Sequence, residues 1–125
     1  MAVPRITREE LKQKLESSDP AGAPVLLDVR LKYPYEHSTM KLPGAVRMHP
    51  QQVDAGSLPR DREVVAYDSD PDEIVSAGVA AQLIRQGYRA RALQGGIAGW
   101  IAANYPTETK EAPKAAPPAP GSLKG

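Results

Sequence analysis

The 125-residue chain contains no cysteine, and this absence narrows its chemistry more than any other feature of its composition. Without a thiol there is no disulfide, no thiolate ligand for a metal and no thiol nucleophile. The absence says little about compartment, because it fits reducing and oxidising surroundings alike. The length suffices for one domain with a modest core.

Long apolar runs and an excess of one charge are also missing. No run approaches the roughly 20 residues of a membrane helix, and residues 1–5 lack the apolar segment of a signal peptide. Sixteen basic and 15 acidic residues give a net charge of +1, which indicates neither a nucleic-acid nor a membrane partner. We therefore expect a cytoplasmic monomer whose partner is an unknown protein.

The chain is organised around residues 63–86. Glu63 to Tyr67 is a short, largely apolar run typical of a buried strand, and an acidic loop interrupted by Pro71 follows it. Apolar positions then recur at helical spacing from Ser76 until Gly87, a left-handed cap, ends the helix. This geometry aims loop amides and the positive end of a helix at one point and favours an anion there. The residue that leaves the strand is Asp68.

The remaining elements alternate strands with helices and predict an α/β domain with a mostly parallel sheet. We expect a helix from residue 6 with Thr7 and Glu10 at capping-box spacing. Further expectations are a buried strand over 24–30, an irregular segment over 31–41, a turn and short strand over 42–48, a helical turn over 51–54, a strand over 88–93 and a helix over 97–102. The domain is expected to span 1–106, and the Pro/Ala-rich residues 107–125 to form a disordered tail.

Polar side chains at the carboxyl end of the predicted strand 24–30 also mark this edge of the sheet. Open α/β sheets place their functional sites at the carboxyl ends of their strands, and Asp28 and Arg30 lie at the carboxyl end of this strand. We interpret the pair mainly as an ion pair that braces loops. His37 and His49 are the only histidines and lack metal-ligand spacing, so we expect no metal and no cofactor.

Four segments in order make residues 5–106 resemble a rhodanese-like domain, the sulfurtransferase fold. They are Leu27-Asp28-Val29-Arg30; Glu36 followed by Leu42-Pro43-Gly44-Ala45; Val64-Val65-Ala66-Tyr67 with Ser76-Ala77-Gly78-Val79-Ala80; and Gly87-Tyr88 with Leu93-Gln94-Gly95-Gly96-Ile97-Ala98-Gly99-Trp100. The resemblance implies a five-stranded, mostly parallel sheet with helices on both faces.

The departure from this family lies at the centre of the expected site. The resemblance implies a catalytic cysteine where Asp68 stands, and the loop is similar to a subgroup that reads Cys-x-Cys-Pro-x-Glu-x-x-Ser, with Asp70 at the second cysteine. A carboxylate forms no persulfide, and the acidic loop repels thiosulfate. We expect Asp68 instead to be ionised, partly buried and hydrogen-bonded to loop amides as an internal anion.

Other interpretations of the acidic loop stay open. Asp68 and Asp70 after a strand resemble the nucleophile motif of haloacid-dehalogenase-type phosphatases, which would make the chain a small metal-dependent hydrolase. Alternation of Asp68, Asp70 and Asp72 resembles the start of a calcium loop, but Glu73 and Val79 exclude an EF-hand and leave only weak Mg²⁺ or Ca²⁺ binding. A third possibility is a sulfurtransferase whose natural form has cysteine at position 68.

The first interpretation is a catalytically inactive rhodanese-like domain that acts as a binding or regulatory module. Such a role is what the resemblance implies for copies of the fold that lack the cysteine. We expect the interaction surface to be the mouth of the former site. Its loop comprises Asp68, Ser69, Asp70, Pro71, Asp72, Glu73, Ile74, Val75 and Ser76, and its rim Asp28, Arg30, Tyr33, Tyr35, His37, Gly95 and Gly96.

Overall fold

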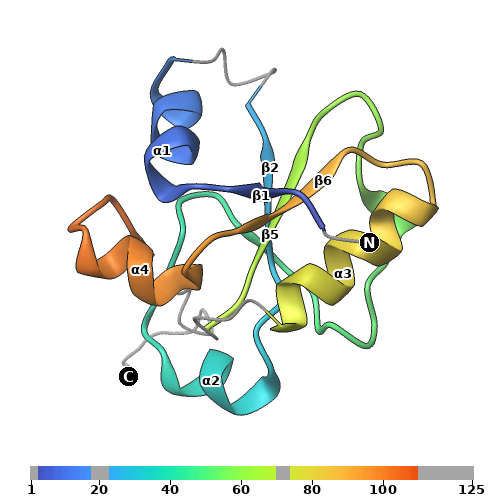
Figure 1. Cartoon of the computed structure of the whole chain (residues 1–125). Coiled ribbons are helices and arrows are strands. Elements are labelled where there is room, and N and C mark those ends of the chain that lie inside the picture. Colours follow the sequence, from blue (N-terminus) through green and yellow to red (C-terminus); the bar gives the residue numbers. More distant parts are fainter. Residues whose placement is uncertain (1–2, 18–22, 70–73, 110–125) are drawn as a thin grey trace, which may run out of the picture.

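The computed structural model describes residues 3–17, 23–69 and 74–109, and it is built around a five-stranded parallel sheet (Figure 1). The strands lie in the order β1 (Arg5–Ile6), β6 (Ala90–Leu93), β5 (Val64–Tyr67), β2 (Val25–Asp28) and β4 (Val46–Arg47). The helices are α1 (Arg8–Ser17), α2 (Lys32–His37), α3 (Ile74–Arg85) and α4 (Gly96–Ala102), with a 3₁₀ turn at Ala55–Ser57. The predicted α/β class with a parallel five-stranded sheet is confirmed. Over the described residues, no helix has the length and apolar character needed to cross a membrane.

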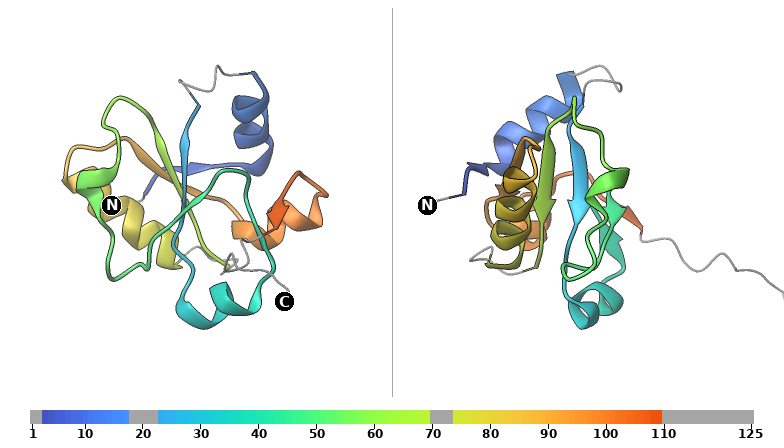
Figure 2. Two further views of the ribbon diagram at one scale, coloured as in Figure 1. Left: turned by 180° about the vertical axis from the view of Figure 1, so that it is seen from behind. Right: turned by 90° about the vertical axis from the view of Figure 1, so that its right-hand side faces the viewer.

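The central strand β5 serves two hydrophobic cores because its side chains alternate between the faces of the sheet. Val65 and Tyr67 pack in the core that includes α1 and α4, where Trp100 is 1% exposed. Val64 and Ala66 pack on the other face, in the core formed with α3. The views in Figure 2 show α3 on one side of the sheet. All four β5 residues are buried, as the apolar run predicted.

Two helix ends have the chemistry that the sequence indicates. The Glu10 N–H donates to Thr7 Oγ1 at 3.1 Å, so Thr7 caps the start of α1. Gly87 has φ +93° after α3, and the N–H of Tyr88 bonds the carbonyl of Leu83 at 3.1 Å. This six-to-one bond over a left-handed glycine is the Schellman ending. It turns the chain directly into β6.

Three local expectations were wrong. The helix expected from residue 6 begins at Arg8, because Ile6 pairs with Leu93 in the sheet as part of β1. Residues 31–41, expected to be irregular, contain helix α2 and the short strand β3 (Met40–Lys41). Pro34 is the third residue of α2, and proline is tolerated in a first turn because that N–H lacks an intrahelical acceptor anyway. The helical turn expected over 51–54 lies instead at Ala55–Ser57.

The folded domain includes described residues beyond the expected boundary at residue 106. Strand β7 (Glu108–Thr109) pairs antiparallel with β3, and Lys41 lies 3.6 Å from the Glu108 carboxylate. Trp100 Nε1 donates to the carbonyl of Pro106 at 2.7 Å, which fixes the approach to β7. Residues 107–109 therefore belong to the folded domain. The rest of the expected tail, 110–125, lies outside the described residues.

Candidate functional site

Asp68 leaves the end of β5 and is buried, with 1% of its surface exposed. Its Oδ2 accepts the backbone N–H of Ser76 at 2.7 Å, and Ser76 is itself completely buried. Its main-chain carbonyl accepts the N–H of Ile97 in α4 at 2.9 Å. Asp68 is thus held by its side chain to α3 and by its backbone to α4.

The bond from Ser76 explains why a carboxylate is stable in this buried position. Ser76 is the third residue of the twelve-residue helix α3, so its N–H is one of the four at the helix start without an intrahelical acceptor. The helix dipole also favours negative charge at this end. The Asp68 side chain therefore lies where β5 meets α3 and accepts a helix-start amide, as expected, but it is fully rather than partly buried.

Only part of the predicted loop can be placed. Ser69 follows Asp68 and is half-buried, while Ile74, Val75 and Ser76 form the first turn of α3. The remaining loop residues of the prediction, Asp70, Pro71, Asp72 and Glu73, lie outside the described residues. Within the described ranges, no group of three His, Asp or Glu side chains could hold a metal ion.

Beside Asp68, the predicted pair Asp28 and Arg30 forms a buried ion pair at the end of β2. Arg30 Nη2 lies 2.7 Å from Asp28 Oδ2, and each residue is 1% exposed. Arg30 Nη2 also donates to the carbonyl of Met40 at 3.1 Å, which attaches the segment after α2 to the sheet. Because both charges are buried and paired with each other, the pair braces the edge of the sheet.

Tyr67 connects this ion pair to the strand that carries Asp68. Its hydroxyl donates to Asp28 Oδ2 at 3.1 Å and accepts the N–H of Leu42 at 3.2 Å. Burial raises the pKa of Tyr67 well above its ordinary value, and the negative charge of Asp28 raises it further. Tyr67 therefore stays a neutral hydrogen-bond donor, and the cluster holds the 28–30, 40–42 and 67–68 segments together.

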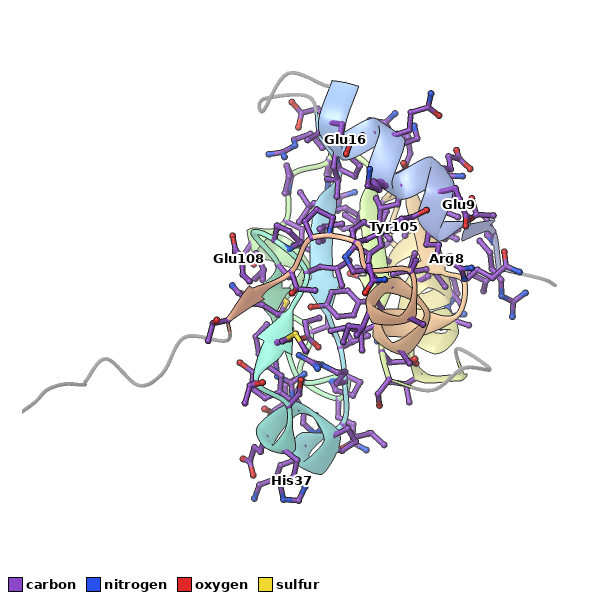
Figure 3. All side chains as sticks on the ribbon, turned by 90° about the vertical axis from the view of Figure 1, so that its left-hand side faces the viewer. Arg8, Glu9, Glu16, His37, Tyr105 and Glu108 are labelled. Atoms are coloured by element: carbon purple, nitrogen blue, oxygen red, sulfur yellow. The ribbon has the colours of Figure 1, made fainter. Side chains whose placement is uncertain are left out.

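The rim residues are divided between fixed and exposed positions. The ring of Tyr35 in α2 lies 5.2 Å from the guanidinium carbon of Arg30 and 4.1 Å from that of Arg47. His37 is exposed at the far end of α2 (Figure 3). Tyr33 is also in α2, but its side chain lies outside the described part. These contacts attach α2 beside the carboxyl ends of β2 and β4.

Gly95 and Gly96 place α4 against Asp68. They have φ values of +82° and +61°, a region that glycine adopts without the steric cost of a Cβ. The chain therefore turns sharply after β6 and presents the N–H of Ile97 to the Asp68 carbonyl. The predicted glycine turn is thus part of the same edge as Asp68 and Ser76.

Sequence reasoning overlooked Tyr67 and Arg47 as parts of this edge. Tyr67 was read only as the last apolar residue of a strand, although it carries the one polar side-chain group of β5. Arg47 donates through Nη1 to the carbonyls of Arg30 at 2.7 Å and Asp28 at 3.2 Å. A hydroxyl at the end of a buried strand was the available signal for Tyr67, whereas the role of Arg47 depends on the pairing of β4 with β2.

Comparisons with known proteins agree with this architecture. The family model of the rhodanese-like domain matches residues 7–103. A tRNA sulfurtransferase of Desulfurococcus amylolyticus is 36% identical over 81 residues, which cover 65% of this chain. The matched region spans only 16% of the length of that relative.

Solved structures show the same fold. A rhodanese-related protein of Thermoplasma volcanium superposes with a TM-score of 0.71 at 20% identity, covering 86% of this chain and 99% of the other. A rhodanese-like domain protein of Staphylococcus aureus gives 0.70 at 24% identity with the same coverage. Because the family model matches residues 7–103, which is most of the chain, the chain belongs to the rhodanese-like domain family.

Proposed function

We propose that this rhodanese-like domain is a protein-binding or regulatory module that transfers no sulfur itself. The observation that carries the proposal is the side chain of Asp68, which stands where the family resemblance places the catalytic cysteine. Its carboxylate accepts the Ser76 amide at 2.7 Å in a buried position. The hydrogen-bond donor that would stabilise a reactive sulfur anion is therefore already engaged.

The chemistry of sulfur transfer supports the same conclusion. The reaction needs a thiolate that takes a sulfane sulfur from a donor and carries it as a persulfide. A carboxylate forms no persulfide, and the 125 residues contain no cysteine that could replace it. Asp70, Asp72 and Glu73 add negative charge to the same loop and oppose the approach of thiosulfate.

The mouth of the former site is the proposed interaction surface. Around it, α2 is fixed by the Tyr35 contacts, and the segment after α2 is fixed by Arg30 and Tyr67. A surface on such braced elements binds a partner with little loss of conformational entropy. The proposed partner is a protein, because different segments of one protein can contact the exposed side chains of α2 and the acidic loop at the same time.

A sulfurtransferase assay with thiosulfate and cyanide tests the missing activity. The unaltered protein should give no thiocyanate above background, while an active rhodanese serves as the positive control. The variant Asp68→Cys supplies the missing thiolate next to the Ser76 amide. It should take one sulfur atom from thiosulfate with release of sulfite, which mass spectrometry detects, but more slowly than the active rhodanese because the acidic loop remains. Turnover by the unaltered protein would refute the proposal.

Affinity capture tests the binding role. A partner retained by the unaltered domain should be lost on changing the mouth, with His37→Ala on the rim and Asp72→Asn in the loop. Asp54→Asn, an exposed aspartate of the 48–58 segment, is the matched control. Retention of the partner by both mouth variants would show that this edge is not the interaction surface.

A further inference from the structure

Two loops at the edge of the sheet opposite Asp68 are joined by a reciprocal pair of arginines. Arg60, before β5, donates through Nη1 to the carbonyl of Gln86 at 2.8 Å. Arg89, before β6, donates through Nη2 to the carbonyl of Asp61 at 2.9 Å. Each guanidinium thus reaches across to the other loop, and both side chains remain exposed.

These contacts hold the guanidinium groups in position without using most of their donors. The guanidinium carbon of Arg60 lies 4.3 Å from the ring centroid of Tyr88, which is 5% exposed and hydrogen-bonded to the carbonyl of Ala55. A guanidinium has five N–H donors in a rigid fork. One hydrogen bond fixes each arginine to the other loop, so the outward donors of Arg60 and Arg89 are preorganised for an anionic acceptor.

The charge at this edge is not balanced. Residues 60–61 and 84–89 contain three arginines, Arg60, Arg85 and Arg89, and one acid, Asp61. Over the described ranges none of these arginines has a carboxylate within ion-pair distance. By contrast, Arg91 in the adjoining strand pairs with Glu63 at 2.6 Å. Among the described residues, Arg60 and Arg89 in the loops and Arg85 at the end of α3 are therefore cations without a carboxylate partner.

An exposed apolar side chain accompanies these cations. Ile84, in the last turn of α3, is 37% exposed and precedes Arg85. Arginine is enriched at protein interfaces, and the buried centre of such an interface is apolar. Single-stranded nucleic acid would instead use free aromatic faces for base stacking, and here Arg60 covers the ring of Tyr88.

We propose that this surface, the arginine edge (Arg60, Arg85, Arg89 and Ile84), binds an acidic protein segment that also carries an aliphatic side chain. The guanidinium forks take carboxylates of the segment, and Ile84 takes its apolar residue. The arginine edge lies at the amino ends of the parallel strands, and the Asp68 site at their carboxyl ends. The domain would then join two partners, and this proposal does not depend on the one made for the Asp68 edge.

The test uses a fluorescent peptide of glutamates around a central leucine, with anisotropy for affinity and amide NMR shifts for location. The shifts should fall on residues 60–61 and 84–89. The variant R60Q/R89Q should weaken binding by about tenfold or more, because it removes two charge-assisted contacts. The control K12Q/K32Q removes the same charge from α1 and α2 and should leave binding nearly unchanged.

Thermal melting checks that each variant is folded. If R60Q/R89Q is unfolded, R60K/R89K carries the test, since lysine keeps the charge and lacks the fork, and it should still weaken binding. If R60Q/R89Q and K12Q/K32Q weaken peptide binding equally, the peptide is attracted only by the overall charge of the domain, and the proposal is overturned. Peptide shifts confined to α2, or tighter binding of a single-stranded RNA at the arginine edge, would overturn it as well.

Discussion

Replacing Asp68 by asparagine or alanine should destabilise the domain, because its carboxylate serves the fold. Asp68→Ala removes the acceptor of the Ser76 N–H, which lies in a completely buried residue. Leaving such a donor without this acceptor costs about 1–3 kcal/mol, and loss of the charge at the start of α3 adds about 0.3–1 kcal/mol. The expected loss is therefore about 1–4 kcal/mol.

Asp68→Asn removes the charge of the side chain but keeps its size and shape. The amide oxygen can still accept the Ser76 N–H, but a neutral bond is about half as strong as a charge-assisted one. We expect a loss of about 1–2 kcal/mol, with the melting temperature falling by about 3–5 °C for each kcal/mol in a domain of this size. The order of stability should be unaltered protein, then Asp68→Asn, then Asp68→Ala.

Urea unfolding followed by the fluorescence of Trp100, the single tryptophan and 1% exposed, measures these differences. Asp54→Asn, at an exposed aspartate, is the control and should stay within about 0.5 kcal/mol. A catalytic nucleophile behaves in the opposite way, since its replacement commonly leaves stability unchanged or raises it. An Asp68→Asn variant as stable as the unaltered protein, with loss of a Mg²⁺-dependent phosphatase activity, would refute our reasoning and favour the hydrolase.

Three further results are expected. Tyr67→Phe should cost about 1–3 kcal/mol in urea unfolding because it leaves Asp28 and the Leu42 N–H without the hydroxyl; an unchanged midpoint would contradict the bracing role. Since the pKa of folded Tyr67 lies above the ordinary value of 10.0, its contribution to stability should be full below pH 10 and decline as the pH rises beyond it, with tyrosinate absorbance showing one tyrosine that ionises only on unfolding. Gly87→Ala should cost about 1–2 kcal/mol because φ is +93° and the new Cβ would lie 2.9 Å from Arg60 Nη1; equal melting temperatures would argue against this strain.

Local patterns predicted the parts of the fold whose causes are local. All four residues of β5 are apolar or aromatic, and Gly87 follows the end of α3. A buried strand and a left-handed cap each depend on a few adjacent residues, so the sequence predicted both. The position of Asp68 follows from the same stretch. A strand, a short loop and a helix in succession leave the first residue after the strand facing the helix start.

The parts that escaped prediction depend on contacts between distant residues. Helix α2 has Pro34 in its first turn, and its Tyr35 ring lies beside Arg30 and Arg47, contacts that no local pattern encodes. Strand β7 exists because Thr109 pairs with Met40, 69 positions away. Likewise, Asp68 is held by α4 as well as by α3. The sequence predicted both helices, but the burial of Asp68 was inferred from the start of α3 alone.

The position of β5 in the middle of the sheet has a consequence for anything that docks near Asp68. This strand has β6 on one side and β2 on the other, with a hydrophobic core on each face. Its amide protons should be among the slowest in the domain to exchange with deuterium, because they open only with the whole structure. A partner that contacts the end of β5 would therefore dock on a rigid strand. Most of the motion in the complex would then lie in the partner.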